Sequence, residues 1–127
     1  PAYFYGPFPV PPRMPTVYRV YVIELSRKVF TEDRRFREAN PQYNGALECL
    51  YVGQTSKTPQ ERFAQHKSDH RNAKGRKLSS NIVEKYGRHL RPSLYQDIGP
   101  LSREEALDIE KGLTLELRRK GYAVWSN

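Results

Sequence analysis

The sequence predicts an α/β (α+β) domain in which a small, mostly antiparallel three-stranded sheet is flanked by helices. Two observations lead to this fold class. Residues 17–25 and 47–53 are early runs rich in β-branched and aromatic residues, and strong helix starts follow at Thr58 and Ser102. The order is strand, insertion, strand, helix, helix, strand, helix. Strands joined early can pair antiparallel, and the helices can then pack on the sheet.

A length of 127 residues fits one compact domain. We assign it to residues 16–127, with an insertion at about residues 26–46. Residues 1–15 form a Pro-rich arm, because six prolines in fifteen residues prevent a regular helix or a central strand. The arm either packs its aromatic side chains on the domain or is a linker from a preceding region.

The first strand, residues 17–25, reads VYRVYVIEL. The insertion is charged and irregular, has room for a short helix over residues 31–39, and ends in the turn signals of NPQYNG. Residues 47–53 (LECLYVG) form the second strand. Gly53 ends this strand at a point where the backbone must turn or another group must approach closely.

The helix after the second strand has a strong start. Thr58 is the expected cap, Pro59 occupies the first helical position, and Glu61 completes a capping box. The helix is expected to end at about Lys67 or His70.

Three shorter elements complete the predicted order. Residues 78–86 form a second short helix that ends at Gly87. Residues 91–98 (RPSLYQDI) form the third strand, and residues 122–127 are a short apolar end segment.

The last helix has signals at both ends. Ser102 and Glu105 form a capping box, and the helix runs to about Lys120 before Gly121 stops it. Its buried face is predicted to consist of the apolar residues at helical spacing, which are Ala106, Ile109, Leu113 and Leu117.

The net charge of +8 favours an anionic partner. A basic surface raises the local concentration of nucleic acid and speeds encounter with it, although a merely soluble basic protein is the alternative.

The single cysteine, Cys49, excludes an internal disulfide and a Cys-rich zinc site, and its apolar surroundings make it a core residue. No run approaches the roughly 20 apolar residues of a membrane span, and the N-terminus has no secretory pattern, so a cytoplasmic location without membrane contact is expected.

One constellation carries chemistry: Tyr51-Val52-Gly53 at a strand end, then Arg62 and His66 on the capped helix. Arg62 and His66 are four residues apart and therefore share a helix face. A strand end and the face of the following helix converge on one small volume. There, the Arg fork can bind phosphate oxygens, and a Tyr or His can orient or deprotonate water.

At these residues the sequence resembles the GIY-YIG nuclease family. Tyr51-Val52-Gly53 is similar to the YIG element, and Arg62 with His66 matches the form that follows it. Two tyrosines compete for the first element: Tyr21, in VYVIEL, is preferred, and Tyr18, in PTVYRV, is the alternative. Being three residues apart, they are expected to point to opposite faces of the sheet. The family's Gly is absent in either register, and the segment between the elements is longer than is typical.

The resemblance implies a late acidic metal ligand, for which Glu110 fits. This residue lies on the inward stripe of the last helix, where a carboxylate is costly unless it is paired or holds a metal. An ion pair with Arg62 is the alternative. Asn127 falls where the family often has a polar residue, and the ion implied is Mg²⁺ or Mn²⁺.

The expected activity is hydrolysis of DNA, with RNA not excluded. The resemblance implies that Tyr21 activates water with help from Tyr51 and His66, while Arg62 holds the scissile phosphate. Arg71 and Lys74, in the basic loop of residues 71–77, are expected to contact the duplex backbone without reading its sequence.

Two other classes of function fit the same sequence. One is a nucleic-acid-binding module that keeps the fold but does not cut, which the missing Gly and the long insertion favour. The other is a protein-interaction domain that uses the Pro-rich arm. Deleting residues 1–15 would abolish partner binding in the latter case and leave nuclease activity untouched. The oligomeric state is left open.

Overall fold

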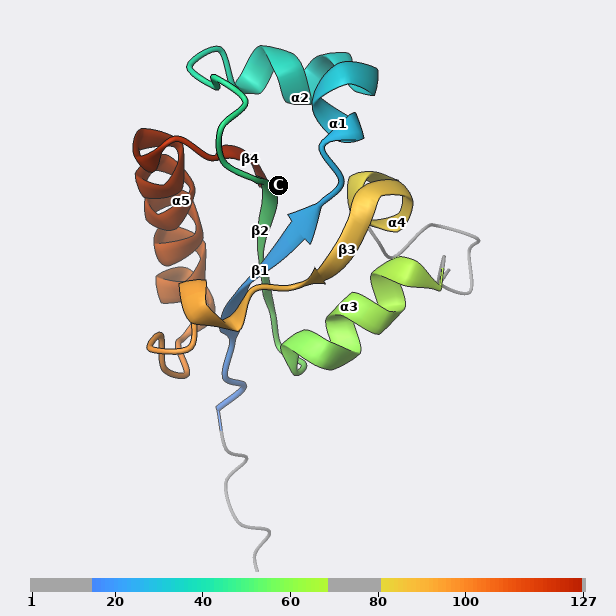
Figure 1. The fold of residues 1–127 in the computed structure, drawn as a ribbon. Helices are drawn as coiled ribbons and strands as arrows, with labels where there is room; N and C mark the ends of the chain where they lie inside the picture. The colour runs from blue at the N-terminus through green and yellow to red at the C-terminus, as the bar shows by residue number, and fades with distance from the viewer. Residues whose placement is uncertain (1–14, 69–80, 127) are drawn as a thin grey trace, which may run out of the picture.

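A computed structural model describes residues 15–68 and 81–126 of the chain. A four-stranded mixed sheet lies between helix α5 on one side and helices α3 and α4 on the other, with α1 and α2 near one end of the sheet (Figure 1). The elements are, in chain order, β1 (Arg19–Leu25), α1 (Lys28–Glu32), α2 (Arg34–Ala39), β2 (Cys49–Thr55), α3 (Pro59–Lys67), α4 (Asn81–Tyr86), β3 (Gly87–Leu90), a 3-10 helix (Pro92–Leu94), α5 (Arg103–Lys120) and β4 (Ala123–Ser126).

The sheet has the strand order β3-β1-β2-β4. β1 pairs antiparallel with β2 and β3, as expected for strands joined early in the chain, but β4 pairs parallel with β2. The prediction of three strands was therefore wrong. The short apolar end segment becomes a strand because α5 crosses the sheet and returns the chain to the edge where β2 is unpaired.

The third strand is also displaced from its predicted position. It covers Gly87–Leu90, and the predicted segment 91–98 instead contains the 3-10 helix. Arg91 still donates a backbone hydrogen bond to Val22, but Pro92 follows and has no N–H to continue the ladder. β3 begins at Gly87, directly after the last residue of α4. No loop separates the two elements, so the strand starts earlier in the sequence than predicted.

The predicted helix starts and stops are confirmed wherever the structure describes them. Thr58 caps α3 by accepting a hydrogen bond from the Glu61 backbone, although the Glu61 carboxylate bonds the Thr58 hydroxyl rather than its backbone N–H. Ser102 and Glu105 form a complete capping box on α5, and Gly121 ends that helix with φ 113°. The predicted start of α4 at residue 78 lies outside the described residues.

The inward face of α5 differs from the predicted apolar stripe. Ala106 and Leu117 are buried, but Ile109 is 39 % exposed, so its predicted burial was wrong. Glu110 is buried, as the sequence predicted, and Thr114, which was not predicted to face inward, is buried beside it on the same helix.

The insertion forms two short helices where the sequence allowed one. Asp33 separates them, because its side chain caps α2 by accepting from the Phe36 backbone at 3.0 Å. Asn40 is buried at the end of α2 and ties the insertion to β4, since its side-chain oxygen accepts from the Val124 N–H at 2.7 Å.

Cys49 is fully buried, as predicted. The arm of residues 1–14 lies outside the described residues.

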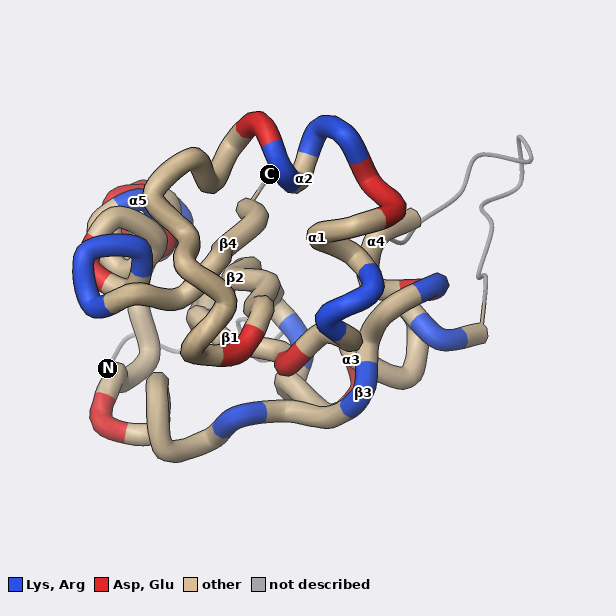
Figure 2. Tube along the Cα trace, turned by 45° about the horizontal axis from the view of Figure 1, so that its top comes forward, with Lys and Arg blue, Asp and Glu red and all other residues tan. Residues whose placement is uncertain are grey.

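Basic residues are spread over several elements. Figure 2 shows Lys and Arg on α1 and α2, on β3 and at the C-terminal end of α5, with acidic residues between them. The net charge alone therefore does not mark a binding face. None of the helices in the described part of the chain has the length and apolar character needed to cross a membrane.

Candidate active site

Gly53 and Tyr21 are the centre of the site. They lie opposite each other on β2 and β1. A Cβ atom at Gly53 would stand 2.6 Å from Tyr21 Oη and 2.9 Å from Tyr51 Cε2. The Tyr21 ring therefore covers the glycine, and Gly53 is required because the two tyrosines occupy the space of a side chain. This close approach explains why a glycine follows Tyr51 at a spacing of two residues.

Helix α3 packs on the face of the sheet that carries these two tyrosines. The Tyr21 hydroxyl and His66 Nε2 are joined by a hydrogen bond of 2.9 Å. The Tyr51 ring meets the His66 ring edge-on at 5.5 Å between centroids. Tyr21 and Tyr51 are each 1 % exposed and His66 is fully buried, so the structure brings three predicted site residues together in the core.

Burial sets the protonation of this group. It raises the pKa of the Tyr21 phenol, to which the neighbouring Tyr51 adds, while the Arg62 guanidinium acts in the opposite direction. Burial, reinforced by the Arg62 charge, lowers the pKa of His66 to about 4. At neutral pH the structure therefore holds a neutral phenol against a neutral imidazole, and Arg62 is close enough to influence both.

Tyr18 and Tyr21 have different surroundings. Tyr21 lies within β1 and contacts His66, whereas Tyr18 precedes β1, bridges to Leu101 through backbone hydrogen bonds and is half-buried. Tyr18 nevertheless lines the pocket that contains Arg62. The geometry thus places Tyr21 in the buried group and Tyr18 at the rim of the neighbouring pocket.

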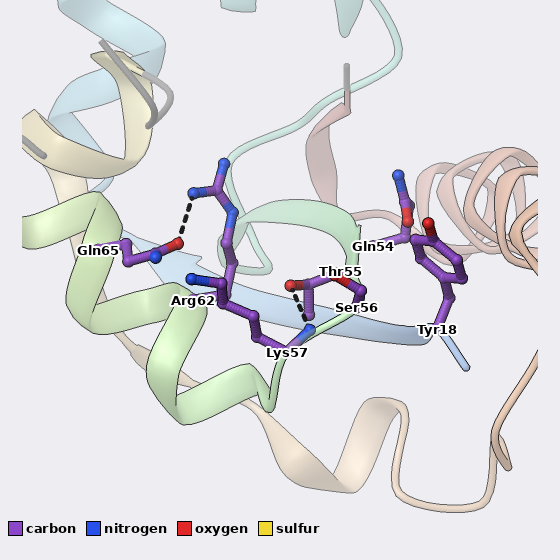
Figure 3. Close-up of a pocket in the computed structure, with 7 residues that line it drawn as sticks. All are labelled: Tyr18, Gln54, Thr55, Ser56, Lys57, Arg62 and Gln65. Carbon is purple, nitrogen blue, oxygen red and sulfur yellow. Dashed lines mark hydrogen bonds between the residues drawn. The ribbon is translucent and has the colours of Figure 1, made fainter. Parts of the chain in front are cut away.

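A pocket of about 320 Å³ opens at the end of β2, beside this group. Figure 3 shows Arg62 and Gln65 on the α3 side and Tyr18 and Gln54 at the end toward α5. Arg62 is half-buried and donates to the Gln65 side chain at 3.1 Å. The full lining is Tyr18, Gln54, Thr55, Ser56, Lys57, Arg62 and Gln65. It holds two cations, hydroxyls and amides but no carboxylate, a composition that fits an anion.

Sequence reasoning missed most of this lining. Lys57, Gln54 and Gln65 were not singled out, although the first two lie in the QTSK run directly after Gly53. Gln54 carries an additional signal that only the structure provides. Its Oε1 atom is buried and has no hydrogen-bond partner among the described residues.

Glu110 approaches from the other face of the sheet. It lies on α5, is 5 % exposed, and burial raises its pKa to about 7 despite the opposing effect of Lys111. Its backbone carbonyl accepts from Thr114, but its carboxylate has no hydrogen bond or ion pair among the described residues. The alternative ion pair with Arg62 is therefore not formed, since Arg62 bonds Gln65 instead.

The remaining predicted residues are not placed. Arg71, Lys74 and Asn127 lie outside the described residues. β4 pairs with β2 only from Cys49 to Val52, which leaves the edge of β2 from Gly53 onward without a strand partner in the described part of the chain. The pocket therefore opens where β2 extends beyond β4, and its lining comes from the residue before β1, the end of β2 and α3.

The donor set for a divalent ion is small. Among the described residues no cluster of three or more His, Cys, Asp or Glu side chains is placed to hold one. The buried Glu110 carboxylate without a partner nevertheless fits Mg²⁺, which keeps several waters and is commonly bound through one or two carboxylates together with substrate phosphates.

A family model described as the GIY-YIG catalytic domain matches residues 42–123. The chain belongs to the GIY-YIG family. Neither a comparison with curated proteins nor one with solved structures gave a match. The family resemblance expected from the sequence is thus confirmed, and membership gives the chain a nuclease-type domain whose general substrate is nucleic acid.

The match has an informative boundary. It contains Tyr51, Arg62, His66 and Glu110 but begins after β1, so it leaves out both Tyr21 and Tyr18. In this GIY-YIG domain the preference for Tyr21 over Tyr18 therefore rests on the contacts of Tyr21 with Gly53 and His66 and not on the family model.

Proposed function

We propose that this domain is a metal-dependent endonuclease that hydrolyses the phosphodiester backbone of DNA. The observation that carries the proposal is the position of Arg62. Its guanidinium lines a pocket without carboxylates and acts electrostatically on the buried Tyr21–His66 pair. A scissile phosphate in the pocket would be held by Arg62, which stabilises the negative charge that builds in the transition state.

The proposed chemistry uses the protein groups as follows. A water oxygen attacks phosphorus and the P–O3′ bond breaks, which leaves a 5′-phosphate and a 3′-hydroxyl. Because the Tyr21 phenol is neutral, we assign it a relay role: it orients the water and takes one of its protons as it gives its own to the neutral His66, while Tyr51 packs against both rings. The leaving 3′ oxygen takes its proton from solvent. Glu110 would hold Mg²⁺ or Mn²⁺, which when bound supplies Lewis-acid stabilisation of the leaving 3′ oxygen.

A second candidate is a nucleic-acid-binding module of the same fold that does not cut. The specific observation in its favour is that Tyr21 and Tyr51 are each 1 % exposed, so solvent has little access to either hydroxyl. In that case the pocket around Arg62 would bind phosphate without hydrolysing it.

Plasmid cleavage distinguishes the two candidates. Wild type is expected to nick supercoiled DNA with Mg²⁺ or Mn²⁺ and to be inactive in EDTA. Arg62→Ala is expected to lose about 100-fold or more of the rate while keeping a wild-type circular dichroism spectrum. Arg119→Ala, an exposed cation on α5, is the matched control and should cleave normally. Binding with a steep salt dependence but no cleavage of DNA or RNA would establish the binding module instead.

A further inference from the structure

A second pocket lies beside Glu110, since the next residue of α5, Lys111, lines it. It has a volume of about 240 Å³ and is formed between α5 and the edge strand β4. We call it the β4-edge pocket and define it by its lining, which is Lys111, Thr114, Leu115, Arg118 and Ser126. Like the pocket at the end of β2, it holds two cations and hydroxyl groups but no carboxylate.

Arg118 is fixed in place in this pocket. Its Nε atom donates to the Asn40 side chain at 3.2 Å and its Nη2 atom donates to the Val124 carbonyl at 2.8 Å. No carboxylate forms an ion pair with Arg118 among the described residues. The guanidinium is therefore held by neutral acceptors, retains its full charge and has a further N–H edge for an anion.

Lys111 carries the second charge and is exposed. Lys111 has no ion pair among the described residues. Its charge acts on Glu110 through space, where it partly offsets the rise in the pKa of the Glu110 carboxyl. Lys120, on the same helix, differs, because it pairs with Glu116 at 3.3 Å. The charges of the β4-edge pocket are thus not neutralised within the described protein.

We propose that the β4-edge pocket is a second phosphate subsite, which binds a backbone phosphate of the nucleic acid within about three nucleotides of the scissile one. The proposal rests on the proposed function above. Lys111 follows Glu110 directly, and Arg118 lies seven residues further, about 10 Å along the helix at 1.5 Å per residue. With a rise of about 3.4 Å per nucleotide, the bound phosphate lies within about three nucleotides of Glu110.

The test is the salt dependence of binding to a DNA duplex, measured by fluorescence anisotropy in EDTA over a KCl titration. Removing one phosphate contact lowers the slope of log K against log[KCl] by about one. Lys111→Ala is expected to show this change with a roughly 5-fold weaker affinity, and Ser126→Asp, which places an acid in the pocket, a larger loss. Arg119→Ala removes the same charge from the same helix outside the pocket and is expected to keep the wild-type slope.

Equal slopes for Lys111→Ala and Arg119→Ala would overturn the subsite, because the cation would then act only through the general field of the protein. Cleavage of the same duplex by wild type with Mg²⁺ separates this result from the proposed function. Normal cleavage with equal slopes overturns the subsite alone. A slope that depends on Lys111 without any cleavage supports the subsite and overturns the nuclease.

Discussion

On the α3 face of the sheet the buried polar groups bond to one another, whereas on the α5 face the Glu110 carboxylate has no partner among the described residues. Tyr21 and His66 satisfy each other at 2.9 Å, and neither needs a ligand to be stable in the core. Glu110 is nearly as deeply buried, and its raised pKa records the cost of keeping its charge there. The difference supports the proposal that Glu110 holds a metal ion, whereas the Tyr21–His66 pair is complete in the protein alone.

Among the variants that test this difference between the two faces, Glu110→Gln is expected to have the largest effect. Removing the metal ligand should lower cleavage about 1,000-fold, the equivalent of several kcal/mol of transition-state stabilisation. Without metal, the same change should raise the free energy of unfolding at pH 8 by about 3 kcal/mol, because a buried charge disappears. Urea unfolding in EDTA measures this gain, and Glu116→Gln, on the exposed side of α5, is the control. A loss of stability would contradict the view that Glu110 has no partner.

The next effect concerns the α3 face. Gly53→Ala places a Cβ atom 2.6 Å from the Tyr21 hydroxyl, so the ring must move away from His66. We expect a loss of about 1–3 kcal/mol in unfolding free energy and a fall in cleavage of at least about 10-fold. Gly112→Ala, where a Cβ atom meets nothing within 4 Å, is the control and should be neutral or stabilising. Normal stability of the Gly53 variant would show that the close packing is not required.

The two faces are also expected to respond to pH with opposite signs. The pKa of His66 is lowered to about 4, so the unfolded state binds more protons below pH 6.5 and stability falls as pH drops toward 4. The pKa of Glu110 is raised to about 7, so the native state binds more protons above pH 4.5 and stability falls as pH rises toward 7. Between pH 4.5 and 6.5 the two effects oppose each other.

Single variants separate these contributions. In EDTA, Glu110→Gln is expected to leave a stability that rises with pH by about 1.4 kcal/mol per unit across this window. His66→Gln should leave a stability that falls by a similar amount. Urea unfolding at four pH values measures both slopes, and the same slope in both variants would refute the assignment.

The smallest effect compares the two competing tyrosines. Tyr21→Phe leaves His66 Nε2 without its hydroxyl partner in the core, which should cost about 1–2 kcal/mol of stability and lower cleavage. Tyr18→Phe removes a hydroxyl at the pocket rim and should change stability by less than about 0.5 kcal/mol. Thermal unfolding of the pair shows the difference, and a larger loss in the Tyr18 variant would reverse the assignment of the first tyrosine.

Local signals in the sequence predicted much of this structure. The caps at Thr58 and Ser102 and the stop at Gly121 each depend on neighbouring residues, and all three are observed. The strand end predicted at Gly53 was wrong, because β2 continues to Thr55. The spacing of Tyr51, Arg62 and His66 likewise predicted the family and the grouping of Tyr51 with His66.

The rest depends on contacts that no local pattern encodes. The parallel pairing of β4 with β2 joins distant segments, and the early start of β3 arises because Gly87 serves a helix and a strand at once. Glu110 is buried as predicted, but Ile109 is exposed because the sheet, and not the apolar periodicity, decides which side of α5 is covered. That the Glu110 carboxylate has no partner among residues 15–68 and 81–126 could be recognised only from the packed structure.

The most direct test of the central claim is the effect of Mn²⁺ on the melting temperature. An ion that binds only the native state raises the Tm, so wild type at pH 7.5 should be stabilised as Mn²⁺ is added. Glu110→Gln should show no such rise, while Arg62→Ala, whose side chain comes from the other face, should respond like wild type. An equal rise in wild type and Glu110→Gln, or no rise in wild type, would contradict the claim that Glu110 is the half of the site built to receive a metal.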